Sequence, residues 1–400
     1  MSQTPLRVAV AGAGAFGKNH LRVYRELETA GPDAAGVGVA LVAAVEPNSA
    51  RAAETTAKYA IPVFATVDEL LAADLKLDAA TVAVPTVHHH AVASTLLDAG
   101  LDLLVEKPLA ASLAEADDLI ARADKGKRIL QPGHLERFNP AVLAVQPQVR
   151  RPMFFESHRL SVFTPRSLDV DVVLDLMIHD LDIVLTFAAS PVREVRAVGL
   201  PILSPKVDIA NVRVEFESGC VANFTASRVS TERVRKLRFF EPRQYVSIDY
   251  ARQDLLVISV EAGAGKASEL IASLPPQVAA LLPPGIAAGI ASGKIDLAKI
   301  DPALIAQFAA MAKIDPSVIA QFTNPAGAHA SLSFSKPAVT PGEPLRLEIT
   351  SFLESVRTRR PSLVTARQGR EALALALEIQ AAMGAHAKRA GLEDFFNPGA

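Results

Sequence analysis

Two residue types are almost absent from this chain of 400 residues, which has one cysteine, Cys220, and no tryptophan. A single cysteine excludes a framework of intramolecular disulfides and is typical of a reducing compartment. Charge of one sign is also lacking, because the formal net charge is only -2. Such a balance gives no field that would attract nucleic acid or an anionic membrane surface.

Long apolar runs are absent as well. No uncharged stretch approaches the roughly 18 residues that a membrane-spanning helix needs. The N-terminus, MSQTPLRVAVAGAGAFG, continues into a strand and a glycine loop, without the basic region, apolar stretch and cleavage site of a signal peptide. We therefore expect a soluble cytoplasmic protein with no membrane span.

The first part of the chain alternates strand-like runs with amphipathic helical stretches. The expected strands are 6–12, 38–45, 79–85, 101–107 and 128–133, and the helices between them lie near 15–29, 48–59, 88–99 and 112–125. This alternation predicts a parallel sheet with helices on both faces. We therefore expect a doubly wound α/β domain of the Rossmann type over residues 1–145.

After Arg151 the pattern changes to runs that alternate apolar with polar residues. These expected strands are 152–160, 192–200, 209–219, 220–228, 236–241, 244–250 and 255–261, and two helices follow at 345–359 and 369–383. Alternation of this kind predicts a large, mostly antiparallel sheet with one face in water. Residues 146–400 are thus expected to form an α+β domain that binds the substrate.

Residues 262–329 interrupt that second pattern and are rich in Ala, Pro and Gly. They contain a repeat, KIDPALIAQF at 299–308 and KIDPSVIAQF at 313–322, in which Asp before Pro predicts the start of a short helix. We interpret this segment as an insertion in a surface loop without chemistry of its own. A lid or an oligomer contact is the alternative interpretation.

Gly12, Gly14 and Gly17 form a G-x-G-x-x-G pattern directly after the first expected strand. The first glycine permits a tight turn, the second lets a pyrophosphate approach the backbone, and the third lets helix and strand pack closely. Free N–H groups and the dipole at the start of the helix then hold the phosphates. In its context of strand, loop and helix, the pattern predicts a dinucleotide site.

Glu46 ends the second expected strand. A carboxylate at this place accepts the ribose hydroxyls of the adenosine and repels a 2′-phosphate, which favours NAD over NADP. Arg51 lies close enough in the sequence to weaken that preference. NAD is the predicted cofactor.

Two further patterns carry acid–base groups. Lys107 ends a parallel strand in LLVEKPLA, at the edge where open α/β sheets bind their ligands. Asp175 and His179 are four residues apart in DLMIHDLDIVL and stack on one face of a helix, with Asp182 three residues further on. Taken alone, these patterns favour an ordinary surface lysine and a buried structural His–Asp pair over catalytic groups.

Together, GAGAFG (12–17), PTVHHHAVASTLLDAGLDLLVEKPLA (85–110) and the D-x-x-x-H-x-x-D spacing resemble the Gfo/Idh/MocA oxidoreductase family. The resemblance covers residues 5–260 and 343–385. It implies that Lys107, Asp175 and His179 flank the reacting carbon, with His179 as general base. One departure is Met177, where many members carry glycine.

The resemblance also implies which residues contact the cofactor, namely Gly12, Gly14, Ala15, Phe16, Gly17, Glu46, Pro85, Thr86, His89, Glu106 and Lys107. We expect no metal site, because the consecutive histidines 88–90 point in different directions and no cysteine or acidic cluster complements them.

The stretches PGHLERFNPAV (132–142) and VVLDLMIHDLDIVL (172–185) resemble a subgroup that oxidises the C3 hydroxyl of UDP-N-acetylglucosamine to a ketone. In that subgroup a partner aminotransferase then makes the diamino sugar of lipid A. The implied contacts to the UDP-sugar come from Lys107, Glu136, Arg137, Asn139, Arg159, Arg166, Asp175 and His179. Of these, Arg159 and Arg166 precede the expected catalytic helix, and we expect them to bind the diphosphate. A homo-oligomer, dimer or tetramer, is expected.

Two alternatives remain open from the sequence. One is a dehydrogenase of a free polyol such as inositol, or of a monosaccharide. The other is a non-catalytic NAD-binding regulator, against which the complete set of Lys107, Asp175 and His179 argues.

Overall fold

The computed structural model describes residues 4–35, 38–163, 170–262 and 330–392. Contacts along the chain group it into two units. The first comprises residues 1–239, 248–255 and 338–400, and the second comprises 240–247 and 256–337. Within the second unit, residues 257–262 of strand β13 (Asp254–Ala262) pair antiparallel with strand β14 (Ala330–Ser335). The predicted insertion falls between these two strands, and its repeats lie outside the described residues.

The predicted parallel sheet is confirmed. Its six strands follow the order β3-β2-β1-β4-β5-β6, and every pairing between neighbours is parallel. This is the strand order of a doubly wound dinucleotide-binding fold. The strands are β1 (Leu6–Ala11), β2 (Val39–Val45), β3 (Val63–Phe64), β4 (Ala79–Val82), β5 (Asp102–Glu106) and β6 (Leu130–Gly133).

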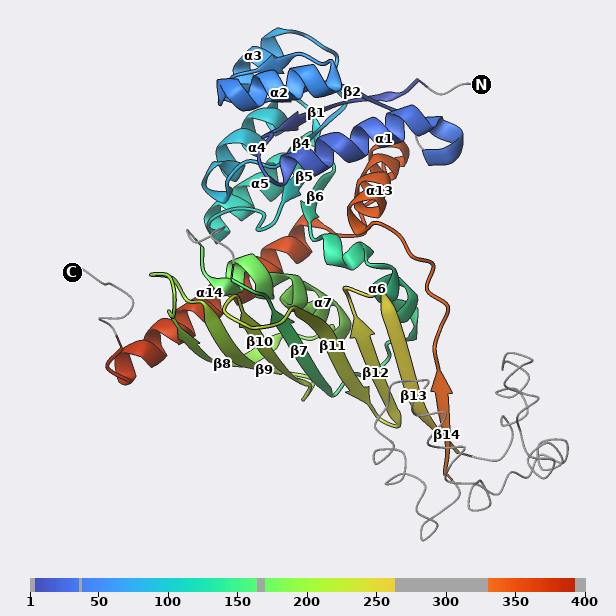
Figure 1. The fold of residues 1–400 in the computed structure, drawn as a ribbon, viewed down its shortest axis with the longest axis vertical. Helices are drawn as coiled ribbons and strands as arrows, with labels where there is room; N and C mark the ends of the chain where they lie inside the picture. Colours follow the sequence, from blue (N-terminus) through green and yellow to red (C-terminus); the bar gives the residue numbers. More distant parts are fainter. Residues whose placement is uncertain (1–3, 36–37, 164–169, 263–329, 393–400) are drawn as a thin grey trace, which may run out of the picture. The chain divides into compact units, whose positions relative to one another are not determined.

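Helices cover both faces of this sheet (Figure 1). Helices α1 (Gly17–Ala35) and α13 (Pro344–Thr358) pack on one face, where Ile349 and Phe352 of α13 join the core formed by β1 and β2. Helices α4 (His89–Asp98) and α5 (Leu113–Gly126) pack on the other face. Helix α13, which is far from β1 and β2 in the sequence, thus completes the core on this face of the first sheet.

Two short elements, a strand of the parallel sheet and the helix that follows it, were not predicted from the sequence. Strand β3 has two residues, Val63–Phe64, and helix α3 (Val67–Ala72) has six. Neither is long enough to show a periodicity, although Thr66 caps α3 by accepting a hydrogen bond from the Glu69 backbone. Helix α2 (Ser49–Tyr59) matches its expected range, with Asn48 as the capping residue.

The second sheet is mostly antiparallel, as predicted, with the strand order β14-β13-β12-β11-β7-β10-β9-β8. Only the β7–β10 pair is recorded as parallel among its described pairings. The remaining strands are β7 (Phe154–Leu160), β8 (Val192–Leu200), β9 (Ile209–Phe216), β10 (Val221–Ser227), β11 (Val234–Glu241) and β12 (Gln244–Asp249). Burial alternates along β7 and β9, which is the expected pattern for a sheet with one face in water.

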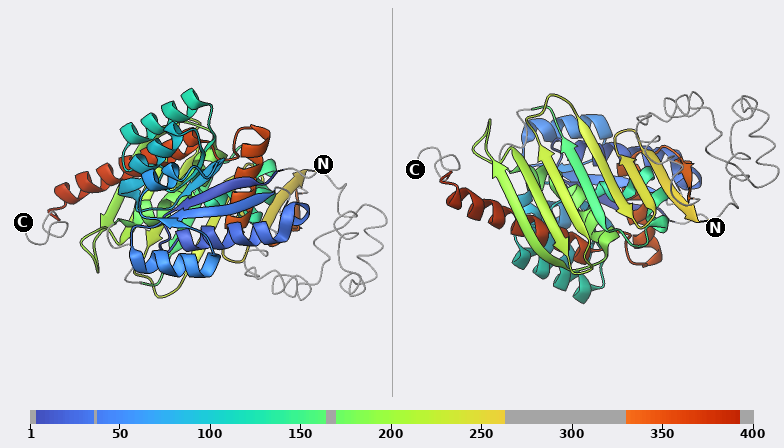
Figure 2. Two further views of the ribbon diagram at one scale, coloured as in Figure 1. Left: turned by 90° about the horizontal axis from the view of Figure 1, so that it is seen from above. Right: turned by 90° about the horizontal axis from the view of Figure 1, so that it is seen from below.

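Helices cover the other face of strands β7–β10. Helix α7 (Ile178–Ala188) packs against α14 (Ala366–Arg389), and α14 runs along β8. A Cβ added to Gly199 of β8 would lie 2.4 Å from the Met383 sulfur of α14 and 2.7 Å from a Val207 methyl group, so the missing side chain makes room for this helix. Seen from below, the opposite face of β7–β10 carries no helix (Figure 2). None of the described helices is long and apolar enough to span a membrane.

Candidate active site

The glycine loop between β1 and α1 has the geometry that its pattern predicts. Gly12 has a φ of +96°, and a Cβ there would lie 2.6 Å from the Ala83 carbonyl oxygen. A Cβ on Gly17 would lie 1.9 Å from the Gly12 carbonyl oxygen, whereas one on Gly14 would meet nothing within 4 Å. Gly12 and Gly17 therefore set the turn and the packing, and Gly14 leaves the backbone open to a ligand.

This loop offers hydrogen-bond donors to an anion. Within the described part of the chain, the backbone N–H groups of Gly14, Ala15 and Phe16 have no recorded partner. They lie just before the first turn of α1, where the helix dipole favours negative charge. Free donors beside the open side of Gly14 fit the pyrophosphate of a dinucleotide.

Glu46 lies at the end of β2, beside the loop, and its side chain is 3% exposed. One carboxylate oxygen accepts a hydrogen bond from the Ala13 backbone (3.1 Å), and the other accepts from Asn48 (2.9 Å) and from the Arg51 guanidinium (2.8 Å). Burial acts to raise the pKa of Glu46, but these hydrogen bonds, led by that from Arg51, lower it below the ordinary value. Glu46 is thus held as a carboxylate, and Arg51 is bound to it.

The E-K-P segment follows β5. The Glu106 carboxylate and the His20 imidazole of α1 form a short hydrogen bond of 2.6 Å. His89 is buried, with one ring nitrogen 2.8 Å from the Pro108 carbonyl oxygen and the other 2.9 Å from that of Val84. Burial lowers the pKa of His89. His89 therefore ties the loop after β4, which carries the predicted contacts Pro85 and Thr86, to the loop after β5.

The segment before α7 brings Asp175 to Lys107. Residues Val173–Met177 form a π-helical turn that leads into α7, instead of the regular helix that the spacing predicts. Such turns are frequent at functional sites. The Lys107 ammonium donates to the Asp175 carbonyl oxygen (2.7 Å) and to that of Leu174 (3.4 Å), and it lies 3.8 Å from the Asp175 carboxylate. Residues 68 positions apart in the sequence thus meet.

His179 follows in the first turn of α7 and makes no hydrogen bond to any described residue; its Nδ1 atom is buried without a partner. Asp175 therefore does not orient the imidazole through that nitrogen. The pKa of His179 is lowered well below its ordinary value, first by burial and then by the positive charges of Lys107, Arg159, His134 and Arg235. The imidazole is neutral near pH 7, which is the form that accepts a proton.

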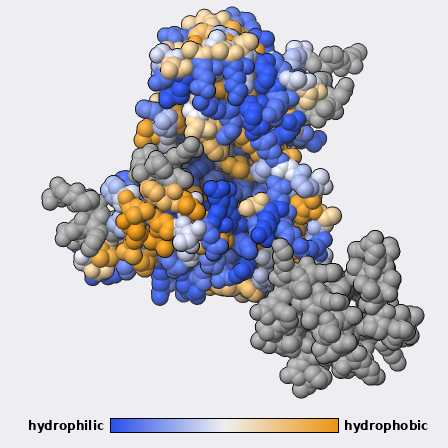
Figure 3. Space-filling view, viewed as in Figure 1, coloured by the Kyte–Doolittle hydropathy of each residue, from blue (hydrophilic) through white to orange (hydrophobic). Residues whose placement is uncertain are grey.

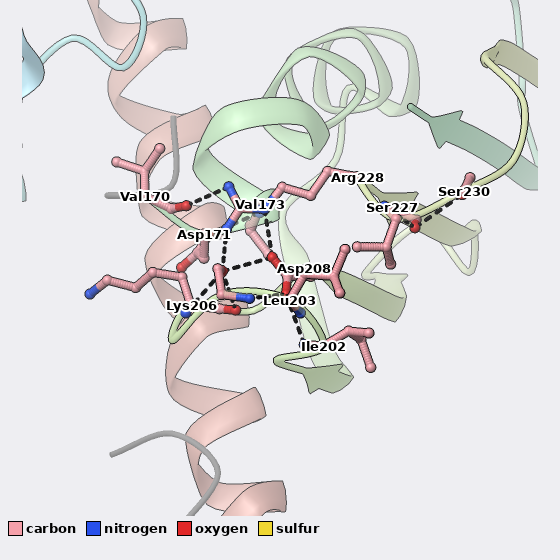
Figure 4. A network of polar contacts seen from close by, with 12 residues as sticks. Val170, Asp171, Val173, Ile202, Leu203, Lys206, Asp208, Ser227, Arg228 and Ser230 are labelled. Carbon is pink, nitrogen blue, oxygen red and sulfur yellow. Dashed lines mark hydrogen bonds and ion pairs between the residues drawn. The ribbon is translucent and has the colours of Figure 1, made fainter. Parts of the chain in front are cut away.

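A buried ion pair anchors the start of this helical segment (Figure 4). Asp208 accepts hydrogen bonds from the Arg228 guanidinium (2.8 Å) and from the backbone of residues 202–204. Burial alone would raise the pKa of Asp208, but these bonds lower it. Arg228 also donates to the Val170 carbonyl oxygen (2.9 Å). Next to it, the Asp171 carboxylate accepts from the backbone of Val173 (2.9 Å) and caps the π-helical turn.

Three of the residues predicted to contact the substrate, Glu136, Asn139 and Arg159, belong to one hydrogen-bonded network. Arg159, whose side chain is 4% exposed, binds Asp180 through two hydrogen bonds (2.7 and 3.0 Å) and Glu136 through a third (3.1 Å). Asn139 donates to Glu136 (3.2 Å) and to the Tyr250 carbonyl oxygen (3.0 Å). These contacts use Nε, Nη1 and Nη2 of Arg159, and its contact with the diphosphate stays a prediction.

Arg137 is also buried. Its guanidinium lies 3.4 Å from the Asp182 carboxylate and donates to the Thr186 hydroxyl. Both partners belong to α7, so Arg137 fixes that helix to the segment after β6. Arg166, the other predicted diphosphate contact, lies outside the described residues. No cluster of three or more His, Cys, Asp or Glu side chains suited to a metal occurs in the part of the chain that the structure describes.

Sequence reasoning missed three buried polar side chains. Gln131 of β6, His134 and Glu348 of α13 are each 0% or 1% exposed, and their side-chain nitrogen or oxygen atoms have no hydrogen-bond partner among the described residues. The pKa of Glu348 is raised well above its ordinary value by burial and by the charges of Glu106 and Asp182. Isolated polar residues in apolar runs were the only signal in the sequence.

A glycine loop with free donors, a carboxylate at the end of β2, and a lysine beside a neutral histidine define an NAD-dependent oxidoreductase. Comparison with known protein families agrees with this assignment. Residues 6–134 match the oxidoreductase family with an NAD-binding Rossmann fold, and residues 141–243 match the C-terminal domain of Gfo/Idh/MocA proteins. The chain belongs to the Gfo/Idh/MocA oxidoreductase family, and its cofactor is NAD.

Individual relatives narrow the comparison. UDP-N-acetylglucosamine 3-dehydrogenase of Acidithiobacillus ferrooxidans is 31% identical over 385 residues, which is 96% of this chain and 99% of that protein. A solved structure of that enzyme superposes with a TM-score of 0.72 at 29% identity, covering 96% of this chain and 99% of the other. An inositol 2-dehydrogenase of Leifsonia xyli is 31% identical over 204 residues, or 49% of this chain and 57% of that protein.

Proposed function

We propose that this chain oxidises the C3 hydroxyl of UDP-N-acetylglucosamine to a ketone, with NAD as the acceptor. The single observation that carries the acid–base part is the contact of Lys107 with the Asp175 backbone and carboxylate, one helical turn from a neutral His179. The choice of substrate is supported by the relative of that activity, which matches almost the whole length of both chains, whereas the inositol 2-dehydrogenase matches about half.

NAD, when bound, accepts the hydride that leaves the sugar carbon. Glu46 and the free donors of Gly14, Ala15 and Phe16 would hold its adenosine ribose and its pyrophosphate. These groups belong to the first sheet and its loops. They bind and orient, and they take no part in the proton transfer.

His179 is the proposed base, and it takes the hydroxyl proton as the C–H bond breaks. Its depressed pKa keeps the imidazole neutral, so no proton has to leave it first. Lys107 has three N–H donors, two of which point to the carbonyl oxygens of Asp175 and Leu174. The same ammonium is proposed to bind the substrate oxygen and to stabilise the negative charge that develops there.

Asp175 is proposed to position Lys107 and to accept a hydrogen bond from a neighbouring sugar hydroxyl. Its carboxylate is partly exposed and lies 3.8 Å from the ammonium of Lys107. Burial lowers the pKa of Lys107, and the negative charge of Asp175 acts against that shift.

A dehydrogenase of a free polyol is the second candidate, and the inositol 2-dehydrogenase relative supports it. It would need the same base and the same lysine. It would have no use for a cation that binds phosphate, so the substrate test separates the two.

We also propose a homo-oligomer, a cytoplasmic location, and a partner aminotransferase that converts the ketone to an amine for a lipid A type sugar. Val198 and Leu200 of the edge strand β8, and Ile202 and Leu203 after it, are 36% to 59% exposed. Figure 3 shows apolar side chains gathered in the region of β8, which is a common mark of an interface. The only cysteine, Cys220, is buried as a free thiol, in keeping with a reducing compartment.

The deciding experiment measures NADH formation at saturating NAD with UDP-N-acetylglucosamine, free N-acetylglucosamine and inositols. We expect a kcat/KM for the UDP-sugar at least a hundredfold above that for every uncharged substrate. Faster oxidation of an inositol would support the second candidate. Absence of NADH with every substrate, together with tight binding of NAD, would support a regulator.

A further inference from the structure

Arg235, near the start of β11, stands apart from the other cations around the candidate active site. It is half-buried, and its guanidinium has no hydrogen bond or ion pair within the residues that the structure describes. Its strand neighbours are placed near carboxylates, with Lys236 3.9 Å from Asp249 and Arg238 3.2 Å from Glu156. A charge that is partly removed from water without a partner costs free energy, unless a ligand supplies the partner.

The side chain of Arg235 lies on the face of the sheet that α7 covers. Phe239, four residues along the same strand, is buried, and its ring centroid lies 5.8 Å from that of Phe187 in α7. Because side chains alternate along a strand, Arg235, Leu237 and Phe239 share this face, while Lys236 and Arg238 lie on the other.

Neighbouring strands place Arg235 beside Arg159. Phe155 of β7 contacts Phe239 of β11 with ring centroids 5.5 Å apart, and Glu156 binds Arg238. These two pairs give an antiparallel register that puts Arg159 opposite Arg235 on the same face. The Arg235 carbonyl oxygen also accepts a hydrogen bond of 3.0 Å from the Tyr250 backbone, and the Arg159 guanidinium lies 5.1 Å from the centre of the Tyr250 ring.

The two arginines differ in what their donors do. Arg159 is bound by Asp180 and Glu136, so its charge is already neutralised. Arg235 is within electrostatic reach of the same two carboxylates, but it makes no direct bond to them. It is also near the candidate base, because its charge helps to lower the pKa of His179, after burial and the charges of Lys107, Arg159 and His134.

We propose that Arg235 binds the diphosphate of the nucleotide sugar and so selects for a substrate of that class. This inference rests on the proposed function. In a sugar that carries its phosphate at C1, one ring carbon separates C1 from the reacting C3. The cation that binds the phosphate must therefore lie near His179 without touching it. The planar guanidinium suits two phosphate oxygens at once, and its donors have no partner among the described residues.

The test compares Arg235→Gln with Lys236→Gln, the adjacent cation on the opposite face of the same strand. We expect Arg235→Gln to raise KM for UDP-N-acetylglucosamine at least tenfold with a much smaller change in kcat, and Lys236→Gln to leave both near the wild-type values. Arg235→Lys keeps the positive charge but lacks the planar guanidinium, so its KM should lie between those of the wild type and Arg235→Gln. Unchanged melting temperatures would show that the variants are folded.

Two further measurements separate this inference from the proposed function. Calorimetry with UDP alone should give at least tenfold weaker binding to Arg235→Gln than to the wild type. Loss of the positive charge should also raise the pKa of His179, which moves the acid limb of the kcat/KM profile to higher pH. Equal UDP affinity of wild type and Arg235→Gln would overturn the role of Arg235 and leave the activity standing. A wild type that neither binds UDP nor oxidises the UDP-sugar would overturn both.

Discussion

The parallel sheet and the second sheet hold their functional groups in different ways. At the parallel sheet the proposed ligand contacts are largely backbone groups, such as the N–H groups of Gly14 and Ala15, which have no partner among the described residues. At the second sheet the groups near the base are side chains fixed by buried ion pairs, such as Arg159 with Asp180 and Arg228 with Asp208. The first arrangement depends on a short contiguous pattern. The second depends on strands and helices that are distant in the sequence.

This difference teaches where specificity can arise. A backbone cradle binds any dinucleotide pyrophosphate, because N–H groups are the same in every residue. A network of paired side chains leaves selected cations unpaired, and Arg235 is such a cation among the described residues near His179. We therefore expect substitutions in the two regions to affect different steps, and the predictions below test that separation.

The largest expected effect comes from His179→Ala. Loss of a positioned base should lower kcat by about 10²–10⁴-fold, and NAD affinity should not change. Because the pKa of His179 is depressed, the wild-type kcat/KM should stay on its plateau below the ordinary histidine pKa of 6.5 and fall only at more acid pH. NADH formation followed across pH checks both points.

Two controls sharpen this prediction. The kcat of Asp175→Asn should lie between that of the wild type and that of His179→Ala. Lys107→Ala combined with His179→Ala should lose less than the product of the single effects, because both side chains act on one oxygen. A fully active His179→Ala enzyme would leave the imidazole a structural group and assign the base to another residue.

The next largest effect is on stability. Asp180→Ala removes the main partner of Arg159 and leaves a buried guanidinium with one carboxylate, which typically costs about 3–5 kcal/mol. Urea denaturation measures this change. Glu194→Ala, which breaks the exposed pair with Arg196, should change the midpoint little. Equal midpoints for the two variants would show that the buried network does not stabilise the second sheet.

A smaller effect concerns the choice of cofactor at the first sheet. Glu46 should make NAD bind at least tenfold tighter than NADP, a difference of about 1.4 kcal/mol. Glu46→Ala removes the carboxylate and frees Arg51 to meet a 2′-phosphate, so the preference should shrink or reverse. Fluorescence titration with both cofactors gives the ratio. Equal affinities in the wild type would contradict the role assigned to Glu46.

The smallest expected effect comes from Glu348→Gln in α13. The folded-state pKa of Glu348 is raised, so its bound proton stabilises the fold below the ordinary pKa of 4.5, and this contribution is lost as pH rises toward the folded pKa. Glutamine carries no such titration. The melting temperature of the variant relative to wild type should therefore increase from about pH 4.5 upward. Glu354→Gln, on the exposed side of the same helix, is the matched control variant.

Much of the fold was predictable because it follows from local patterns. The parallel strands are short buried apolar runs separated by amphipathic helices, and β7 and β9 show plain alternation. Strand β3 was not predictable, because two residues cannot show a period. The π-helical turn at Val173–Met177 was not predictable either, because it depends on how Asp171 and the Arg228 network anchor its start.

The amino-acid sequence by itself determined the dinucleotide loop, since the steric needs of Gly12 and Gly17 and the carboxylate of Glu46 act within one strand–loop–helix unit. Tertiary structure alone decided which cations near His179 form ion pairs within the protein. Arg159 lies on an expected strand and Arg235 directly precedes one, and nothing beside them in the sequence shows which of the two is paired. Asp180 and Glu136 approach Arg159 from other elements, and Arg235 receives no such partner among the described residues. Whether a charge is neutralised depends on distances between distant segments, which packing sets.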